Sequence, residues 1–456
     1  TIFNSGFTFS QCAKLEEVIF AVNSEEYNPD GTLVSKLTHI GGSSFSMCYA
    51  LKSIELPNSV QYLGSMAFSQ CTAMTSAKLS DGITNLASIR VGSTLTLNQI
   101  FYQCSKLTSV TLPKNLTALG DSSFSGCSSL ATIDLPETLT AINNNTFQNC
   151  TALTSVEIPA TVTKIGQNAF SASGLTSITI PGTVKTIDKN AFLNCKSLAT
   201  ATLESGITTI KDKAFSGCIA LQSIVVPDSV TTMGLQVFQS CVSLKSATIS
   251  KSINFTTSNY LNTIFEGCSG LETLILKNAN LKVDAENALV LNISGNTLYN
   301  VYKAGNNADG IVDIPSGVTT IAYEAFANLS WVKKVNLPST VTTIGQYAFY
   351  GCTSLTEILF PDDIVTIGDY AFKGARFTSV KLLNLSLTGK GAFADCEYLE
   401  TVELGVKTRI AERMFENTAV TEIIAYSDTV GDKAFAGCKN LTSVTIPDSV
   451  IEIGDR

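Results

Sequence analysis

The chain has 456 residues, of which 45% are hydrophobic and only 15% charged, and its formal net charge is −8 with a pI near 4.9. This acidic balance disfavours nucleic acid and anionic membranes as partners, because both are themselves negatively charged. No run of about 18 apolar residues is present, so we expect no membrane insertion by this segment. A composition this apolar predicts an ordered chain with ample material for a core.

A repeat of 22 or 23 residues organises the sequence, and a phenylalanine marks each copy. A fixed period of this length overrides the usual expectation of several globular domains, because each repeat contacts only its neighbours. The seventeen anchor phenylalanines are Phe9, Phe45, Phe68, Phe101, Phe124, Phe147, Phe170, Phe192, Phe215, Phe238, Phe265, Phe326, Phe349, Phe372, Phe393, Phe415 and Phe435. We expect them to stack in one ladder opposite a ladder of Leu, Val and Ile.

The copy that ends at Phe170 predicts the elements of one repeat. Apolar residues over 153–158 predict a short strand, which Pro159 ends because proline has no N–H for a sheet ladder. A second extended piece follows, and Gly166 then predicts a tight turn with positive φ. Residues 167–170 predict a single helical or 3₁₀ turn that carries the anchor.

Departures from the regular spacing divide the sequence into three segments. Residues 1–276 predict a solenoid with loop insertions near 21–33 and 80–92, and residues 311–456 predict its continuation with a truncated last repeat. Between them, 277–310 predicts an insertion that interrupts the repeats. Its apolar residues alternate on both sides of Ser294–Asn296, which is typical of a β-hairpin, and we expect this hairpin to project from the solenoid.

The motif L-x-x-V-x-I-P-x-x-V-x-x-I-G-x-x-A-F, as it stands at Leu153–Phe170, resembles the BspA-like leucine-rich repeat, and the resemblance covers nearly the whole chain. It implies a β-rich leucine-rich repeat solenoid of about 18 repeats. A parallel sheet would form the concave face, and short strands with 3₁₀ or helical turns the convex face. The long convex helices of better-known leucine-rich repeats are not expected.

The same resemblance carries the expected function. Members of that family are mostly surface or secreted proteins of bacteria and some protists, and several are associated with adhesion to host proteins. We therefore expect a non-enzymatic, extracellular or cell-surface protein that mediates protein–protein or protein–glycan interaction, with host matrix or surface proteins as partners. The alternative is a passive stalk that presents another domain. The last repeat stops before its Ala-Phe, so we expect the natural protein to continue beyond one or both ends.

Cysteine follows the anchor phenylalanine by three residues in thirteen repeats. In the other four repeats the same slot holds Ser173, Leu329, Ala375 or Thr418, which favours a packing position. No C-x-x-C is present, so zinc-type spacing is absent. We expect buried structural thiols, with disulfides between adjacent coils and metal binding as the alternatives. The cysteines are Cys12, Cys48, Cys71, Cys104, Cys127, Cys150, Cys195, Cys218, Cys241, Cys268, Cys352, Cys396 and Cys438.

Other chemistry-bearing motifs are weak. His39 is the single histidine and falls at a repeat position that other copies fill with Lys164 or Ala118, so we expect it on the surface. The Asp-Gly segments at 26–31 and 307–310 lack the full calcium-loop pattern and predict plain turns. Phosphate-binding glycine loops and a nucleophile elbow are absent. We therefore expect no cofactor, no metal and no catalytic residues.

The exposed face of the predicted main strands remains as the candidate site. Side chains alternate along a strand, so the residues that flank the central apolar position point away from the core. Between 109 and 248 they are mostly Ser and Thr, which can simply solvate a sheet. Toward the C-terminus they mix charge with exposed apolar side chains, which is typical of a partner surface. The candidate partner-binding residues are Lys334, Asn336, Glu357, Leu359, Lys381, Glu403, Glu422 and Ile424.

Overall fold

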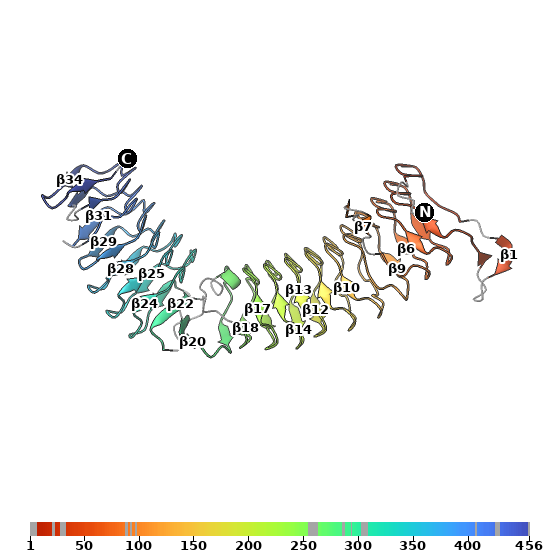
Figure 1. The fold of residues 1–456 in the computed structure, drawn as a ribbon, viewed down its shortest axis with the longest axis horizontal. Helices are drawn as coiled ribbons and strands as arrows, with labels where there is room; N and C mark the ends of the chain where they lie inside the picture. Colours follow the sequence, from red (N-terminus) through yellow and green to blue (C-terminus); the bar gives the residue numbers. More distant parts are fainter. Residues whose placement is uncertain are drawn as a thin grey trace. The chain divides into compact units, whose positions relative to one another are not determined.

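The computed structural model describes residues 7–20, 23–27, 33–86, 90–91, 94–95, 98–253, 263–284, 288–292, 294–301, 309–405, 408–424 and 429–454. The chain forms two compact units (Figure 1). Unit 1 comprises Thr1–Ile253 and Ile264–Gly270, and unit 2 comprises Asn254–Thr263 and Leu271–Arg456.

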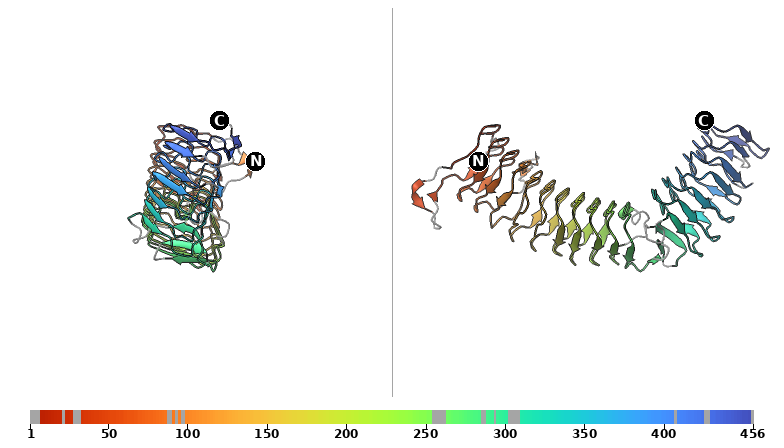
Figure 2. Two further views of the ribbon diagram at one scale, coloured as in Figure 1. Left: turned by 90° about the vertical axis from the view of Figure 1, so that its left-hand side faces the viewer. Right: turned by 180° about the vertical axis from the view of Figure 1, so that it is seen from behind.

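Both units are β-solenoids of the leucine-rich repeat type with little helix, and their described residues form about 16 parallel coils. Each regular coil contains a main strand, a short strand and a run of tight turns. The prediction of a leucine-rich repeat solenoid is thus confirmed, with slightly fewer coils than the repeats counted in the sequence. The strands of successive coils lie side by side in both units (Figures 1 and 2).

Unit 1 arranges its strands in two parallel sets. The main strands are β4 (Ser53–Glu55), β6 (Ser76–Lys78), β9 (Ser109–Thr111), β12 (Ser177–Ile180), β14 (Thr200–Leu203), β16 (Ser223–Val225) and β18 (Ser246–Ile249). The short strands are β3 (His39–Ile40), β5 (Tyr62–Leu63), β10 (Ala141–Ile142), β11 (Lys164–Ile165), β13 (Thr186–Ile187), β15 (Thr209–Ile210) and β17 (Thr232–Met233). Equivalent residues of adjacent coils pair in register, as Ser177 does with Thr200.

The strand predicted over 153–158 does not form, although Leu153 and Ile158 are buried as expected. Asp134 and Glu157 occupy the same exposed repeat position in successive coils. Like charges at neighbouring positions disfavour strand pairing, which agrees with the absence of a ladder at this point.

Antiparallel pairs lie at the two insertions predicted in unit 1 and extend past their predicted ends at 33 and 92. In the first, β1 (Asn23–Tyr27) pairs with β2 (Leu33–Val34). In the second, β7 (Arg90–Val91) pairs with β8 (Thr94–Leu95).

Unit 2 repeats the two-strand plan after an irregular start. Its first strands are β19 (Thr273–Leu276), β20 (Leu281–Asp284), β21 (Leu289–Asn292) and β22 (Thr297–Val301). The main strands are β23 (Ile311–Asp313), β25 (Lys334–Asn336), β27 (Glu357–Leu359), β29 (Ser379–Leu382), β31 (Thr401–Leu404), β32 (Glu422–Ile424) and β34 (Ser443–Thr445). The short strands are β24 (Thr320–Ile321), β26 (Thr343–Ile344), β28 (Thr366–Ile367), β30 (Leu387–Thr388), β33 (Thr429–Val430) and β35 (Glu452–Ile453).

The predicted hairpin is present, since β21 and β22 pair in antiparallel fashion, but it does not project. β22 also pairs in parallel with β24, the first short strand, so the hairpin continues the sheet of unit 2. The hairpin packs against the solenoid because its leucines, Leu289, Leu291 and Leu298, are buried in the core of the unit. The division into segments 1–276, 277–310 and 311–456 stays a prediction.

The turns differ from prediction in a specific way. Asn168 and Ala172, two residues on either side of Phe170, are the left-handed residues, with φ of 52° and 55°. The Ser171 amide donates to the Asn168 carbonyl within the coil, whereas the Phe170 amide donates to Ala191 of the next coil. The Ser173 amide likewise donates to the Phe170 carbonyl, so the bonds within the coil define consecutive β-turns, and the single helical or 3₁₀ turn predicted over 167–170 does not form.

Gly166 does not have positive φ, so the prediction that a tight turn with positive φ requires this glycine is wrong. A Cβ at this position would lie 2.7 Å from the backbone carbon of Asn143 in the preceding coil. Glycine is therefore required here because the two backbones approach closely.

The anchor phenylalanines form the predicted ladder in each unit. In unit 1, adjacent rings from Phe9 to Phe265 stack with centroids 5.0 to 5.7 Å apart. In unit 2, the rings from Phe326 to Phe435 stack at 4.4 to 5.7 Å. Near-parallel rings at these distances suit offset stacking, so each anchor adds ring contacts to the burial of its apolar surface.

The cysteines form a second ladder beside the phenylalanines. Eleven are buried, Cys12 is exposed and Cys438 is half-buried, and all thirteen are free thiols. A typical thiol, that of Cys127, donates to the Phe101 carbonyl oxygen of the preceding coil at 3.1 Å. In the slot that holds Ser173, the hydroxyl lies 3.3 Å from the Cys195 sulfur. The interior thiols therefore have the expected packing role.

Candidate partner-binding face

The first four candidate residues lie together on the main face of unit 2. β25 and β27 pair in parallel, so Lys334 lies opposite Glu357 and Asn336 lies opposite Leu359. The central residues of these strands, Val335 and Ile358, turn toward the core. The alternation predicted from the sequence is therefore what places the four side chains on one face.

Two ion pairs cross between coils on this face. The Lys334 ammonium lies 2.8 Å from a Glu357 carboxylate oxygen. The Lys381 ammonium lies 3.2 Å from Glu403, since β29 and β31 place these residues opposite each other. Both pairs are largely exposed, so each stabilises the fold by about 1 kcal/mol at most.

The remaining candidates lie farther along the solenoid. Glu422 and Ile424 extend outward from β32, which pairs with β34, and Ile424 is 43% exposed. The eight predicted residues are thus distributed over three separately paired groups of main strands: β25 with β27, β29 with β31, and β32 with β34.

Leu359 is the most exposed apolar side chain of the described main strands of unit 2, with 82% of its surface exposed. The facing residue on the preceding strand is Asn336, whose amide donates to an Asp313 carboxylate oxygen at 2.7 Å. A leucine this exposed gains nothing from the hydrophobic effect within the chain. In unit 1, Val225 occupies the equivalent position of β16 and is 58% exposed.

Hydroxyl side chains dominate the equivalent face in the middle of unit 1. Many of those beside the main strands bond to the backbone of the preceding coil, as Thr108 does to the Thr75 carbonyl at 2.9 Å. Their hydrogen-bonding capacity is partly used within the solenoid, which agrees with a solvated sheet face.

His39 and the two Asp-Gly segments are the other candidates named from the sequence. His39 is exposed and its Nδ1 lies 2.9 Å from the Thr38 hydroxyl, as expected of a surface histidine. Within the described residues no group of three or more His, Cys, Asp or Glu side chains is arranged to hold a metal ion. Asp309 accepts a hydrogen bond from the Ile311 amide, which is a plain turn. Asn28, Asp30, Gly31, Asn307 and Ala308 of the two Asp-Gly segments lie outside the described residues.

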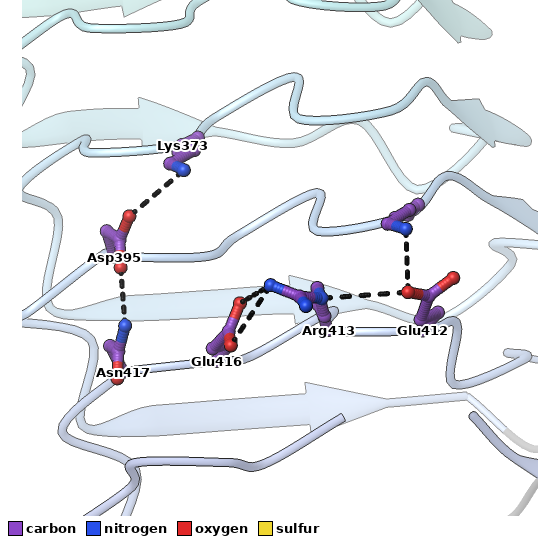
Figure 3. Close-up of polar contacts among 7 residues, drawn as sticks. Lys373, Asp395, Glu412, Arg413, Glu416 and Asn417 are labelled. Carbon is purple, nitrogen blue, oxygen red and sulfur yellow. Dashed lines mark hydrogen bonds and ion pairs between the residues drawn. The ribbon is translucent and has the colours of Figure 1, made fainter. Parts of the chain in front are cut away.

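A cluster of polar side chains on the turns of unit 2 was missed in the sequence (Figure 3). Asp395 accepts from Asn417 at 2.7 Å and pairs with Lys373 at 3.2 Å. Beside it, Glu412 pairs with Lys390 at 2.6 Å, and this hydrogen bond raises the pKa of Lys390 and lowers that of Glu412. These residues are scattered in sequence, and only their positions relative to the anchor phenylalanines could have grouped them.

Arg413 extends the same cluster, pairing with Glu416 at 3.2 Å and with Glu412 at 3.6 Å (Figure 3). Each carboxylate of the cluster thus has a cationic partner. The cluster is a fixed, nearly neutral array of donors and acceptors.

Comparison with known proteins supplies the family. The model of the BspA-type leucine-rich repeat region matches residues 5–90, 84–199, 185–291, 306–421 and 408–456. Solenoids of this family are usually non-catalytic, and their repeats typically bind proteins. No curated protein matches the chain in sequence. In the described part of the chain, no helix has the length and apolarity that a membrane span requires.

Several solved structures are similar to this chain. A leucine-rich repeat protein from Bacteroides ovatus is 24% identical, with 83% of each chain covered and a TM-score of 0.50, and it supports the fold. A leucine-rich cell surface protein from Faecalibacterium prausnitzii is 21% identical, with 90% of this chain and 83% of that chain covered and a TM-score of 0.39. The pneumococcal vaccine antigen PcpA is 15% identical, with 93% and 96% covered and a TM-score of 0.42. Because their TM-scores are below 0.5, the Faecalibacterium and pneumococcal structures carry no further argument about the fold.

Proposed function

Because this chain belongs to the BspA-type leucine-rich repeat family, we propose that it is a cell-surface or secreted adhesion protein whose unit 2 binds a protein partner. The binding face comprises Lys334, Asn336, Glu357, Leu359, Lys381, Glu403, Glu422 and Ile424. The partner is a protein of a host surface or matrix, or of a neighbouring cell. The observation that carries this proposal is the exposure of Leu359 among charged side chains on the main face.

This arrangement has the composition of a small protein interface. An exposed apolar side chain serves as the anchor that a partner buries, and surrounding polar groups supply orientation and exclude water. Each of the two ion pairs, Lys334–Glu357 and Lys381–Glu403, has no net charge. A partner therefore does not need a large opposite charge. Binding through this face would therefore depend only weakly on salt.

A passive spacer is the second candidate function, and the middle of unit 1 favours it. Many Ser and Thr side chains there bond to the backbone of the preceding coil, as Thr108 does to Thr75 and Thr176 does to Thr154. Val225 is the exposed apolar residue of the main strands in this part of the unit. A stalk needs only a rigid repeat with a solvated surface.

Direct binding separates the two candidates. We would measure binding of the purified chain to a panel of immobilised extracellular matrix proteins by surface plasmon resonance. The Glu357→Lys/Lys381→Glu variant places like charges at both cross-coil pairs and is expected to weaken binding about ten-fold or more. The Lys334→Glu/Glu357→Lys variant keeps an ion pair with its direction reversed, so it controls for stability.

A loss of affinity in both variants, with unchanged thermal unfolding, would support recognition at this face. Equal affinity of the wild type and both variants would overturn the site assignment. If the wild type binds none of the proteins, the spacer is favoured.

A further inference from the structure

The turns of unit 2 carry tyrosines in three successive coils. The ring centroids of Tyr323 and Tyr347 lie 5.9 Å apart, and those of Tyr347 and Tyr370 lie 5.5 Å apart. A fourth ring, that of Tyr350, packs edge-on against Tyr347 at 5.5 Å and is 37% exposed. We define Tyr323, Tyr347, Tyr350 and Tyr370 as the tyrosine cluster.

Two of these tyrosines occupy a backbone conformation that disfavours them. Tyr347 and Tyr370 are left-handed, with φ of 54° and 52°. The same repeat position holds Asn145 and Asn168 in unit 1, at φ of 54° and 52°. Asparagine tolerates this conformation well, whereas a bulky aromatic residue pays a steric cost. The left-handed conformation recurs at this position along the solenoid, as at Met66 and Lys213, so what distinguishes these two coils of unit 2 is the aromatic side chain.

The surroundings accommodate the Tyr370 ring. The next coil has Gly391 at the equivalent position, and a Cβ there would overlap the ring. The Lys373 ammonium lies 5.5 Å from the centre of the same ring, within the range of a cation–π contact. Lys373 also pairs with Asp395 (Figure 3), so this lysine links the tyrosine cluster to the polar array of the turns.

The chemistry of this surface favours a neutral ligand. The carboxylates of the array already have cationic partners, as in the pairs of Lys390 with Glu412 and Arg413 with Glu416. A charged ligand would have to compete with these pairs. The apolar area is also modest, since Tyr323, Tyr347 and Tyr370 are half-buried. A stable protein interface buries about 800 Å² on each partner and has an apolar centre.

We propose that the tyrosine cluster and the adjoining polar array bind a neutral oligosaccharide along the axis of unit 2. Because Tyr347 and Tyr370 stack face to face with an interplanar angle of 10°, a sugar would pack its apolar C–H groups against the ring edges and against Tyr350. Its hydroxyls both donate and accept hydrogen bonds. The coil repeat spaces the tyrosines at intervals similar to the length of one sugar residue in an extended chain. Asp395, Asn417 and Glu412 are held in place by their partners, so a sugar would bind to preorganised groups.

Calorimetric titration of the full chain with neutral hexasaccharides tests this site. The probes are β-1,4-linked glucose, xylose, mannose and N-acetylglucosamine hexamers, each at up to about 10 mM. The Tyr347→Asn/Tyr370→Asn variant removes both rings and inserts the residue that the same position holds in unit 1, so the fold should be kept. Val225→Asn, on the main face of unit 1, is the matched control.

We expect at least one hexamer to bind and the tyrosine double variant to lose about ten-fold or more in affinity, with Val225→Asn unchanged. The absence of binding by all four hexamers, or equal affinity of the double variant, would overturn the proposal. Weakened binding of a matrix protein by the double variant, without any sugar binding, would also overturn it and assign the cluster to a protein partner. Protein binding at the main face is measured separately by surface plasmon resonance. A negative result for sugar binding therefore leaves the proposed protein-binding function untouched, and the reverse also holds.

Discussion

The Cys150 thiol donates a hydrogen bond to the Phe124 carbonyl oxygen of the preceding coil at 3.1 Å. The same contact recurs along both units, and it joins the cysteine slot to the backbone of the anchor phenylalanine. The cysteine therefore packs as a small apolar residue with one weak donor.

Substitution at this slot should follow its packing role. Cys150→Ala removes both the donor and the sulfur, and we expect a loss of about 1–2 kcal/mol in the free energy of unfolding. Cys150→Ser keeps a donor, as Ser173 does naturally, and should cost less than Cys150→Ala. Urea denaturation measures both variants. An alanine variant as stable as the wild type would contradict a structural role for the thiol.

Buried thiols also predict a dependence of stability on pH. Burial raises the pKa of Cys150 from its ordinary value of 9.0 to about 12. Above pH 9 the unfolded chain loses this proton while the folded chain keeps it, so the stabilisation is complete below pH 9 and is lost as the pH rises toward 12. Each such thiol should contribute a fall of about 1.4 kcal/mol per pH unit across this window.

The Cys150→Ser variant isolates that contribution, because all other titrating groups are the same in both proteins. Its free energy of unfolding should fall less steeply than that of the wild type between pH 9 and 11. Parallel curves for the two proteins would be incompatible with a buried thiol at this position.

The position of a phenylalanine along its ladder should determine how much it stabilises. Phe215 is fully buried and stacks on Phe192 at 5.0 Å and on Phe238 at 5.7 Å. Phe9 is 47% exposed and stacks on Phe45 at 5.2 Å. Phe215→Ala should cost about 3–5 kcal/mol, and Phe9→Ala clearly less. Equal losses in chemical denaturation would argue against nearest-neighbour stabilisation of the solenoid.

The close approach at Gly166 predicts a cost for even one methyl group. Gly166→Ala would force its Cβ against the Asn143 backbone, and we expect a loss of about 1–3 kcal/mol. The matched control is Ala172→Gly, which relieves a left-handed alanine and adds chain flexibility, so it should change stability by less than about 1 kcal/mol. Thermal unfolding of both variants checks this, and similar losses would contradict the assignment of the two positions.

The repeat period predicted the solenoid and both ladders because each depends on residues that recur at fixed spacing. The turns were less predictable, since the left-handed position of Asn168 holds Met66 in one coil and Lys213 in another. Glycine occupies that position at Gly391 but not in these coils, so no recurring glycine marks it. A glycine in a motif can be required either for positive φ or for close approach of two backbones. The sequence alone did not show which of these applies to Gly166.

Of the candidate site, strand alternation predicted which side chains are exposed. It could not predict the Lys334–Glu357 and Lys381–Glu403 pairs, because these depend on how long side chains lie across neighbouring coils. The tyrosine cluster was missed, although Tyr347 and Tyr370 both precede their anchor phenylalanine by two residues. Alignment of the repeats on the anchors would have revealed this pair.

The most direct test of the proposed function compares two exposed apolar residues at the same repeat position. Leu359→Asn and Val225→Asn remove equivalent side chains from the main faces of unit 2 and unit 1, and neither should change thermal unfolding. We predict that Leu359→Asn weakens binding to the recognised matrix protein about ten-fold or more, whereas Val225→Asn leaves the affinity unchanged. Equal affinities of both variants and the wild type in surface plasmon resonance would contradict binding through the main face of unit 2.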